Sequence, residues 1–195
     1  MAPGLRDRWR NEAMRTIQEC ALDLFDERGF SAIKIDDIAA AAGVSASSIY
    51  RYFGTKEGLL VADEFDIMNE EAIQQILDVN DLVGSLVNVV RSYEAASGGT
   101  VSGSSAPHRR IRYFFEEPSV RRAACASLDR AAQRVAPMLV SSSMTETQAR
   151  VAANAVAFGY FGALEQWYLD GGQRPIADYV EEGLRPLRNI WAKSD

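Results

Sequence analysis

Cysteine and histidine are nearly absent from this chain of 195 residues, and their scarcity excludes several kinds of site. Cys20 and Cys125 are the only cysteines, and His108 is the only histidine. Two cysteines cannot build a disulfide scaffold, and one histidine leaves Cys/His zinc sites and His-based catalytic triads without their residues. A Gly-rich phosphate loop is missing too. We therefore expect no enzyme, no metal site and no cofactor.

Long apolar runs are missing as well. No stretch approaches the roughly 20 apolar residues that cross a bilayer, and residues 1–9 lack the apolar segment of a secretory signal. Hydrophobic residues make up 47% and charged residues 25%, an ordinary globular mixture that excludes wholesale disorder. The sequence predicts a cytoplasmic protein with no membrane partner, built as one domain or as a small domain plus a medium one.

Cations are the minority charge, with 21 Lys and Arg against 27 Asp and Glu, a net charge of -6. This balance argues against a protein that coats nucleic acid. The charge is unevenly spread, however: residues 1–60 hold eight cations and nine carboxylates, and residues 61–195 hold the remaining 13 and 18, so the split is -1 and -5. Residues 38–56 contain no carboxylate. Contact with DNA should be confined to that window and to the arm of residues 6–10, which either approaches DNA or is a solvated terminus.

Strand signals are nearly absent, whereas helical periodicity is strong. Met14, Ile17, Ala21 and Phe25 recur on one face of a helix that Gly29 would end. The pattern predicts an all-α fold, with a flexible Gly- and Ser-rich connection over residues 97–107. Further helices are expected over residues 35–42, 45–53, from 56 onward, and over 70–79, 81–96, 108–116, 118–140, 145–169 and 176–191.

A helix-turn-helix pattern lies in the N-terminal third. Two short helical segments are separated by a tight turn at Gly43, and Ser45 is placed to cap the second segment. Ile49 and Phe53 are four residues apart and are predicted to face the core. The side chains of residues 50–52 would then point outward or sideways, as a helix that contacts DNA requires.

The same segment resembles the N-terminal domain of TetR-family (tetracycline-repressor-type) transcriptional regulators over residues 12–62. The resemblance rests on pieces that keep their mutual spacing, at residues 21–25, 29–30, 35–39, 42–45, 49–53 and 55–60. It implies that residues 45–53 form a recognition helix in the major groove. The residues that the resemblance assigns to DNA are Lys34, Ser45, Ala46, Ser47, Ser48, Tyr50, Arg51, Tyr52 and Lys56.

Lys34 departs from the family pattern, which often has Thr or Ser at this position to cap the second helix and bind a phosphate. A lysine cannot cap an N-terminus, and its charge opposes the helix dipole. We interpret the capping role as lost or moved to a neighbour, and the phosphate role as kept by a point charge. Two other positions keep a second interpretation: Tyr50 as packing between helices, and Ser45 as a cap alone.

The resemblance also implies a DNA-binding domain over residues 1–55 and an effector-binding and dimerisation domain over residues 56–195. The two last helices would form the interface of a homodimer, unless they pack only within one subunit. The expected interface residues are Ala155, Gly159, Gly162, Ala163, Val180, Leu184, Leu187 and Trp191. Side chains of the middle helices would line a ligand pocket, with plain core packing as the alternative. The expected pocket residues are Tyr93, Tyr113, Phe114, Met138, Asn154, Phe158, Phe161 and Trp167.

The sequence therefore predicts a ligand-responsive, sequence-specific transcriptional regulator. We expect a repressor, released from a palindromic double-stranded DNA operator by an unidentified small-molecule effector. Two alternatives stay open: a helical small-molecule-binding protein, and an architectural DNA-binding protein without an effector.

Overall fold

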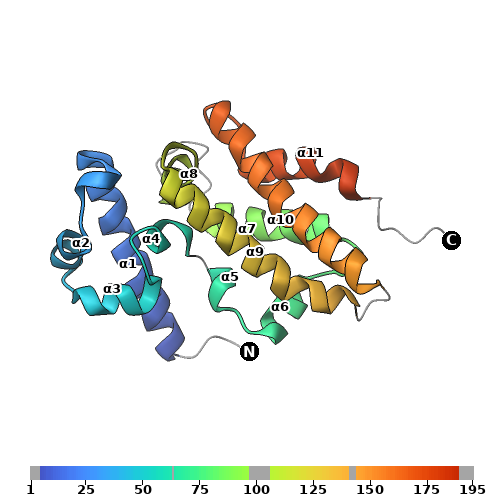
Figure 1. Cartoon of the computed structure of the whole chain (residues 1–195), viewed down its shortest axis with the longest axis horizontal. Coiled ribbons are helices and arrows are strands. Elements are labelled where there is room, and N and C mark those ends of the chain that lie inside the picture. The colour runs from blue at the N-terminus through green and yellow to red at the C-terminus, as the bar shows by residue number, and fades with distance from the viewer. Residues whose placement is uncertain (1–4, 63, 97–105, 141–143, 189–195) are drawn as a thin grey trace. The chain divides into compact units, whose positions relative to one another are not determined.

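The computed structural model describes residues 5–62, 64–96, 106–140 and 144–188 (Figure 1). Every regular element within these ranges is a helix, which confirms the all-α prediction. The elements are α1 (Leu5–Arg28), the short 3-10 helix η1 (Phe30–Ala32), α2 (Ile35–Ala42), α3 (Ala46–Phe53), α4 (Gly58–Val61), α5 (Glu64–Ile67), α6 (Glu70–Ile76), α7 (Leu82–Ala96), α8 (Ala106–Glu116), α9 (Pro118–Val140), α10 (Glu146–Leu169) and α11 (Ile176–Arg188).

The chain divides into two compact units. The first comprises Met1–Ala62 and Tyr113–Ala123, and the second comprises Asp63–Arg112 and Ala124–Asp195. The first unit extends past residue 55, where the sequence placed a domain boundary. The reason is that Gln18 Nε2 on α1 donates to Leu59 O within α4 and to Ala62 O just after it, at 3.0 Å each.

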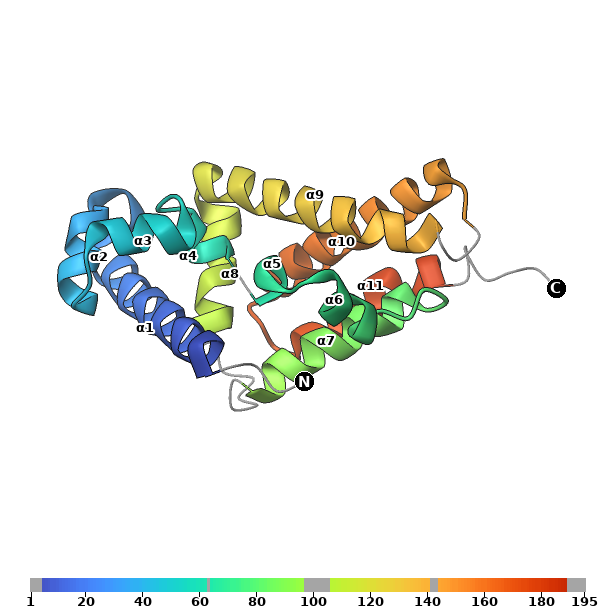
Figure 2. The same cartoon turned by 90° about the horizontal axis from the view of Figure 1, so that it is seen from below.

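The first unit is built around one face of α1. The long apolar periodicity of this helix buries Ile17, Leu22 and Phe25, and α1 packs against α2 and α4 while α2 packs against α3 (Figure 2). Ile38 of α2 and Ile49 of α3 are fully buried. Because each short helix contributes one apolar face to this common core, the opposite faces of α2 and α3 are left at the surface.

The second unit is a helical bundle in which α11 packs against both α10 and α7 (Figure 1). Close approach of α10 and α11 depends on Gly159, since a Cβ there would lie 2.4 Å from Leu184 Cδ2. Arg91 Nη2 of α7 lies 2.5 Å from Glu181 Oε2 of α11, and Arg188 Nε of α11 lies 3.3 Å from Oδ1 of Asp81, the residue just before α7.

Helix ends differ from the predictions by a few residues. The fourth helix begins at Gly58 and not at residue 56, since residues 56–57 form a turn before it, where the Gly58 N–H donates to Thr55 Oγ1 at 3.0 Å. Helix α6 ends at Ile76, since Leu77 is already extended. The predicted end of the last helix at residue 191 lies outside the described residues.

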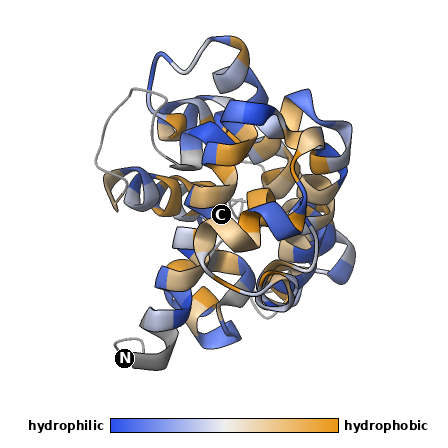
Figure 3. Ribbon diagram, turned by 90° about the vertical axis from the view of Figure 1, so that its left-hand side faces the viewer, coloured by the Kyte–Doolittle hydropathy of each residue, from blue (hydrophilic) through white to orange (hydrophobic). Residues whose placement is uncertain are grey.

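Hydrophobic and hydrophilic residues share individual helices of the bundle, as amphipathic helices around a core require (Figure 3). Among the described helices, none combines the length and the apolar character that a membrane crossing needs.

Candidate nucleic-acid interface

A tight glycine turn sets the geometry between α2 and α3. Gly43 adopts the left-handed conformation with φ +66°, which side chains rarely tolerate, and the Val44 N–H donates to Ala39 O at 3.0 Å. Ile38 of α2 and Ile49 of α3 are buried, and α2 packs against both α1 and α3. The turn and this shared core fix α3 as a short helix whose outer side is exposed, as the sequence predicted.

The start of α3 is a cluster of hydroxyl groups. Ser45 Oγ caps the helix by accepting from the Ser48 N–H at 3.2 Å, and it lies 2.8 Å from Ser47 Oγ and 2.9 Å from Ser48 Oγ. Ala46 between them is half-buried and offers only a methyl group. The small side chains let the N-terminus of α3 come close to a nucleic-acid backbone, where hydroxyl and backbone N–H groups can bind phosphate.

The outer side of α3 presents larger polar side chains. Ile49 and Phe53 are buried, as predicted, whereas Tyr50 is 54% exposed and Arg51 is exposed. Tyr52 is half-buried, and its ring meets that of Phe53 edge-on with centroids 6.3 Å apart. An exposed tyrosine on a helix of this kind is not needed for the core, so the packing interpretation of Tyr50 loses its support.

Lys34 precedes α2 and leaves the capping to a neighbour. Its side chain makes no capping hydrogen bond, while its backbone N–H donates to Asp37 Oδ2 at 2.8 Å. Asp36 and Asp37 in the first turn also suit the positive end of the helix dipole. The exposed Lys34 ammonium therefore does not cap α2, and its contact with a phosphate stays a prediction.

Lys56 has an anchoring role that the sequence did not reveal. Its Nζ donates to Phe30 O at 2.8 Å and to Ile33 O at 3.0 Å, and it lies 4.1 Å from the centroid of the Phe30 ring. The lysine thus joins the start of α4 to η1 and to the residue before Lys34. Nothing local in the sequence indicates these acceptors, because they are backbone carbonyls more than 20 residues away. Contact of Lys56 with a phosphate stays a prediction.

The arginines at the N-terminus lie in a helix. The first helix begins at Leu5, nine residues before the apolar pattern becomes clear, so residues 6–10 form its first turns and not an extended arm. Arg10 is exposed. The short α2 and α3, the cations Lys34 and Arg51, and the serine cluster together make up what we call the helix-turn-helix surface.

Comparison with protein-family models gives the decisive observation. Residues 17–62, which span the C-terminal half of α1 and all of α2, α3 and α4, match the model of bacterial regulatory proteins of the tetR family. The segment that holds the helix-turn-helix surface is thus that of a tetR-family regulatory protein.

Two named regulators match parts of the chain. A transcriptional regulator of Mycobacterium tuberculosis, MftR, is 27% identical over 115 residues, 58% of this chain and 57% of that protein. An HTH-type transcriptional repressor of the same organism is 45% identical over 53 residues, 27% of this chain and 28% of that protein. The chain thus spans only 57% and 28% of the lengths of these two relatives.

A solved structure extends the likeness over nearly the whole chain. FadR of Thermus thermophilus, a TetR-family transcriptional repressor solved in complex with lauroyl-CoA, covers 93% of this chain and 96% of its own with a TM-score of 0.55. Its sequence identity is 20%, so this likeness shows that the two chains share a fold.

Two residues expected in a ligand pocket belong to the first unit. Tyr113 is buried; its hydroxyl donates to Asp26 Oδ1 at 2.7 Å, and its ring lies 5.9 Å from that of Phe25. Phe114 meets Phe115 edge-on at 6.5 Å. The structure therefore uses Tyr113 in the core beside α1 and does not group these two residues with the rest of the expected pocket.

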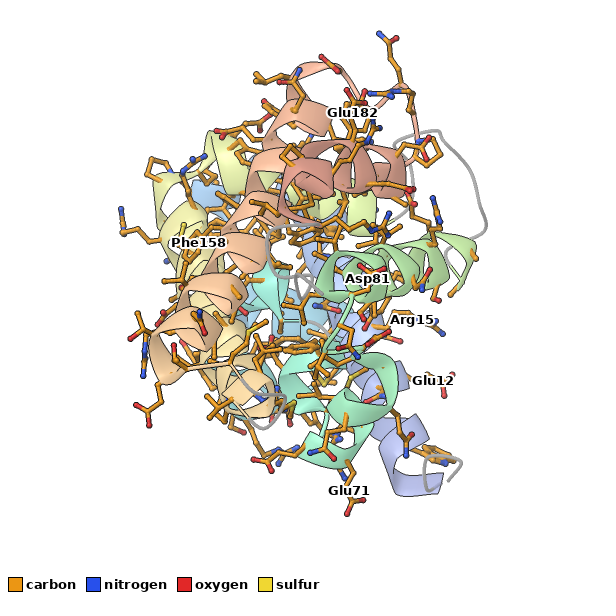
Figure 4. The ribbon with its side chains drawn as sticks, turned by 90° about the vertical axis from the view of Figure 1, so that its right-hand side faces the viewer. Glu12, Arg15, Glu71, Asp81, Phe158 and Glu182 are labelled. Atoms are coloured by element: carbon orange, nitrogen blue, oxygen red, sulfur yellow. The ribbon has the colours of Figure 1, made fainter. Side chains whose placement is uncertain are left out.

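The other expected pocket residues lie in the second unit but are spread over it. Phe161 and Trp167 are buried, Tyr93 and Met138 are half-buried, and Phe158 is 41% exposed. Asn154 bonds its own helix, donating to Arg150 O at 2.9 Å. Phe158 is thus at the surface, unlike the buried pair Phe161 and Trp167 (Figure 4).

Trp167 has a partner that the sequence did not single out. Its Nε1 donates to Arg174 O at 3.0 Å, and its ring lies 5.2 Å from the ring of the buried His108. Burial lowers the pKa of His108 below its ordinary value of 6.5, and the nearby charge of Glu94 opposes this shift in part. A lone histidine carries no sequence pattern, so only the fold reveals this cluster.

The expected dimer residues divide into two groups. Val180 and Leu184 are fully buried within one chain, the buried Ala163 lies near Gly183 of α11, and the half-buried Gly159 lies against Leu184. These four take part in packing within one subunit, and their contact with a second subunit stays a prediction. Packing within one subunit follows because α11 turns its apolar stripe inward, onto α10 and α7. The remaining residues within the described chain are the half-buried Ala155 and Leu187 and the exposed Gly162, whereas Trp191 lies outside the described residues.

An apolar stripe nevertheless remains exposed on α10. Val151 is 58% exposed, Phe158 41% and Leu169 69%, and their spacing of seven and eleven residues places them on one side of the helix with Ala155 and Gly162. We call these five residues the outer stripe of α10.

In the described part of the chain, no three His, Cys, Asp or Glu side chains gather as metal ligands.

Proposed function

We propose that this TetR-family chain is a sequence-specific DNA-binding transcriptional regulator that responds to a small molecule. The observation that carries the proposal is the helix-turn-helix surface. Hydroxyl groups, Tyr50 and Arg51 share the exposed side of α3, and no carboxylate interrupts residues 38–56. The relatives named as a regulator and as a repressor support the same conclusion, and the latter favours repression.

The surface fits the major groove of double-stranded DNA. An α-helix with small residues in its first turn enters that groove, and its hydroxyl and backbone N–H groups meet phosphates and base edges. We propose that the nine residues assigned to DNA by the resemblance divide these tasks. The exposed Lys34 would contact a phosphate beside α2, Tyr50 a phosphate beside α3, and the serine cluster the groove itself.

Dimerisation would raise the affinity for DNA and would match the two-fold symmetry of a palindromic operator. One eight-residue recognition helix buries little surface, whereas two helices about 34–36 Å apart can read a palindrome across successive major grooves. The outer stripe of α10 supports this proposal, because an exposed apolar row with small residues between the large ones suits packing against a second copy of the same helix. We propose that the second unit carries this interface.

The effector would bind in the second unit. The buried Phe161, Trp167 and His108 offer aromatic surface there, and a ligand bound to one arrangement of the unit would shift the population of DNA-competent dimers. FadR of Thermus thermophilus was solved with lauroyl-CoA, so acyl-CoA thioesters are a reasonable first probe. Such a regulator would act in the cytoplasm, on operator DNA.

DNase footprinting tests the proposal. Duplexes selected from a random library by the purified chain should show one protected palindromic site, and addition of an effector should release it.

Replacing Lys34 with Ala should weaken binding to every sequence similarly and reduce the salt slope by about one unit, because one phosphate contact is lost. Arg122→Ala, which removes an exposed arginine outside α2 and α3, is the control. Equal protection of any duplex would contradict the proposal and favour an architectural DNA-binding protein.

A further inference from the structure

We propose that Arg51 reads a guanine at a fixed position of each operator half-site, and that Tyr52 positions its guanidinium for this contact. The inference rests on the proposed function and adds to it the base that is recognised and the residue that recognises it. It follows from the position of Arg51 on α3, from the hydrogen bonds that already engage the other nearby cation, Lys56, and from the contacts between Arg51 and Tyr52.

Arg51 lies at the centre of the exposed side of α3. An α-helix has about 3.6 residues per turn, so a residue two positions from both Ile49 and Phe53 points away from the side that they bury. Ser47, four residues earlier, lies on the same line along the helix. The tyrosines at positions 50 and 52 flank this line. In a groove, the central line faces the base edges and the flanks face the two phosphate backbones.

Arg51 is also the cation best placed to reach a base. Between residues 38 and 56 the sequence contains only two cations, Arg51 and Lys56. Lys56 Nζ already donates to Phe30 O and Ile33 O at 2.8 and 3.0 Å. The serines at the start of α3 are short and bond one another at 2.8–2.9 Å. Among these side chains, only Arg51 combines exposure, length and positive charge.

Tyr52 holds the guanidinium of Arg51 before any DNA arrives. Arg51 Nη2 donates to Tyr52 Oη at 3.3 Å, and its Cζ lies 4.9 Å from the centroid of the Tyr52 ring. The Tyr52 ring is itself seated edge-on against the buried Phe53. A side chain that is already ordered loses less rotamer freedom on binding, so this arrangement favours a contact with defined geometry over a diffuse attraction to phosphate.

The chemistry of the guanidinium selects guanine. Its fork of N–H donors matches the O6 and N7 acceptors that guanine presents side by side in the major groove. Adenine replaces the first acceptor with an amino donor, and cytosine presents only a donor, so neither accepts both bonds. A lysine at this position would keep the charge but could not form the planar two-bond contact.

Selection from a random duplex library, followed by sequencing, tests the inference with the full chain. The wild type should enrich guanine at one position of each half-site. Arg51→Lys and Arg51→Ala should lower the preference at that position alone by about 5- to 150-fold, the value of one two-bond base contact. Tyr52→Phe keeps the ring and removes the hydroxyl, and should lower it by about 2- to 10-fold. Arg122→Ala, at an exposed arginine outside α3, should retain the wild-type preference.

Each outcome decides one claim. If Arg51→Lys retains the guanine preference, or if Arg51→Ala weakens all sequences equally, Arg51 is a phosphate contact and the inference is wrong while the proposed function stands. If Tyr52→Phe selects as strongly as the wild type, the positioning role is wrong. If the wild type enriches no sequence, the proposed function itself fails. Because Arg51 is exposed, unchanged thermal melting of its variants will separate these results from misfolding.

Discussion

Lys56 connects three segments of the first unit through a single ammonium group. Its bonds to Phe30 O and Ile33 O attach the segment between α1 and α2 to Lys56, which lies two residues before the start of α4. Lys34 is only one residue beyond Ile33, so this anchor also fixes where α2 begins. A lysine that resembles a phosphate contact in sequence is therefore also part of the framework that shapes the helix-turn-helix surface.

Replacing Lys56 with Met should destabilise the protein while preserving the packing of the side-chain stem on Phe30. Two half-buried carbonyls would lose their donor, and we expect the free energy of unfolding to fall by about 1–3 kcal/mol. Lys34→Met is the matched control, because its exposed ammonium makes no capping bond, and its effect should stay within about 0.5 kcal/mol. Urea denaturation measures both. Equal stabilities of the two variants would show that the carbonyl bonds contribute nothing.

His108 should make stability depend on pH. Burial lowers the pKa of the folded-state imidazole below 6.5, so the unfolded chain takes up its proton first as the pH falls. The free energy of unfolding should then decrease from about pH 7 downward, through the lowered pKa of the folded state. In His108→Gln this contribution is absent, and the advantage of the wild type over the variant should shrink between pH 7.5 and pH 5. An advantage that grows as the pH falls would reverse the sign of our account.

At the scale of single residues, the sequence predicts what depends on helical spacing. The burial of Ile49 and Phe53 and the Ser45 cap follow from positions within one helix. The acceptors of Lys56 and the contact between the tilted rings of His108 and Trp167 depend on segments that meet only in the fold, so no local pattern indicates them.

At the scale of elements, helices α10 and α11 form a contact whose partner the sequence left open, either a helix of the same chain or a second subunit. The small residues of α10 indicate a close helix–helix contact, and the contact exists at Gly159. Its partner is α11 of the same chain, and not a second subunit. Helix α10 is apolar or small on most of its circumference, so its periodicity cannot distinguish the side that meets α11 from the side that stays exposed.

Adding a methyl group at Gly159 should disrupt this contact. An alanine Cβ would lie 2.4 Å from Leu184 Cδ2, and Leu184 is fully buried and has little room to move. Gly183→Ala on α11 is the matched control, because its Cβ would meet Ala163 at an ordinary 3.7 Å. Both changes gain about 1 kcal/mol of helix propensity, so we expect Gly159→Ala to be less stable than Gly183→Ala by about 1–3 kcal/mol. Identical thermal unfolding of the two variants would disagree with the packing described here.

At the scale of the whole molecule, the outer stripe of α10 gives the proposed dimer its test. Phe158 is 41% exposed in the single chain, so Phe158→Glu should leave the fold intact. If the stripe is the interface, a charge at its centre should raise the dimer dissociation constant by at least about 30-fold, the effect expected at a central aromatic contact. Ile76→Glu, at an apolar residue of α6 that is 36% exposed, should not change it. Sedimentation velocity that shows the same dimer for all three proteins would place the interface elsewhere.

The charge distribution of the molecule favours binding to DNA through the helix-turn-helix surface alone over general attraction to any DNA. The segment up to residue 60 carries -1 and the remainder -5, while the exposed side of α3 carries no carboxylate. The acidic remainder repels DNA, so affinity for a random duplex should be low and contact should depend on the helix-turn-helix surface.

Competition between duplexes measures the central claim most directly. A labelled duplex carrying the selected palindrome is bound by the purified chain at physiological salt and is then challenged with an unlabelled palindrome or an unlabelled random duplex. For a sequence-specific regulator, we predict that the random duplex competes at least about 1,000-fold less effectively than the palindrome. Competition by the two duplexes within a few-fold of each other would contradict the account.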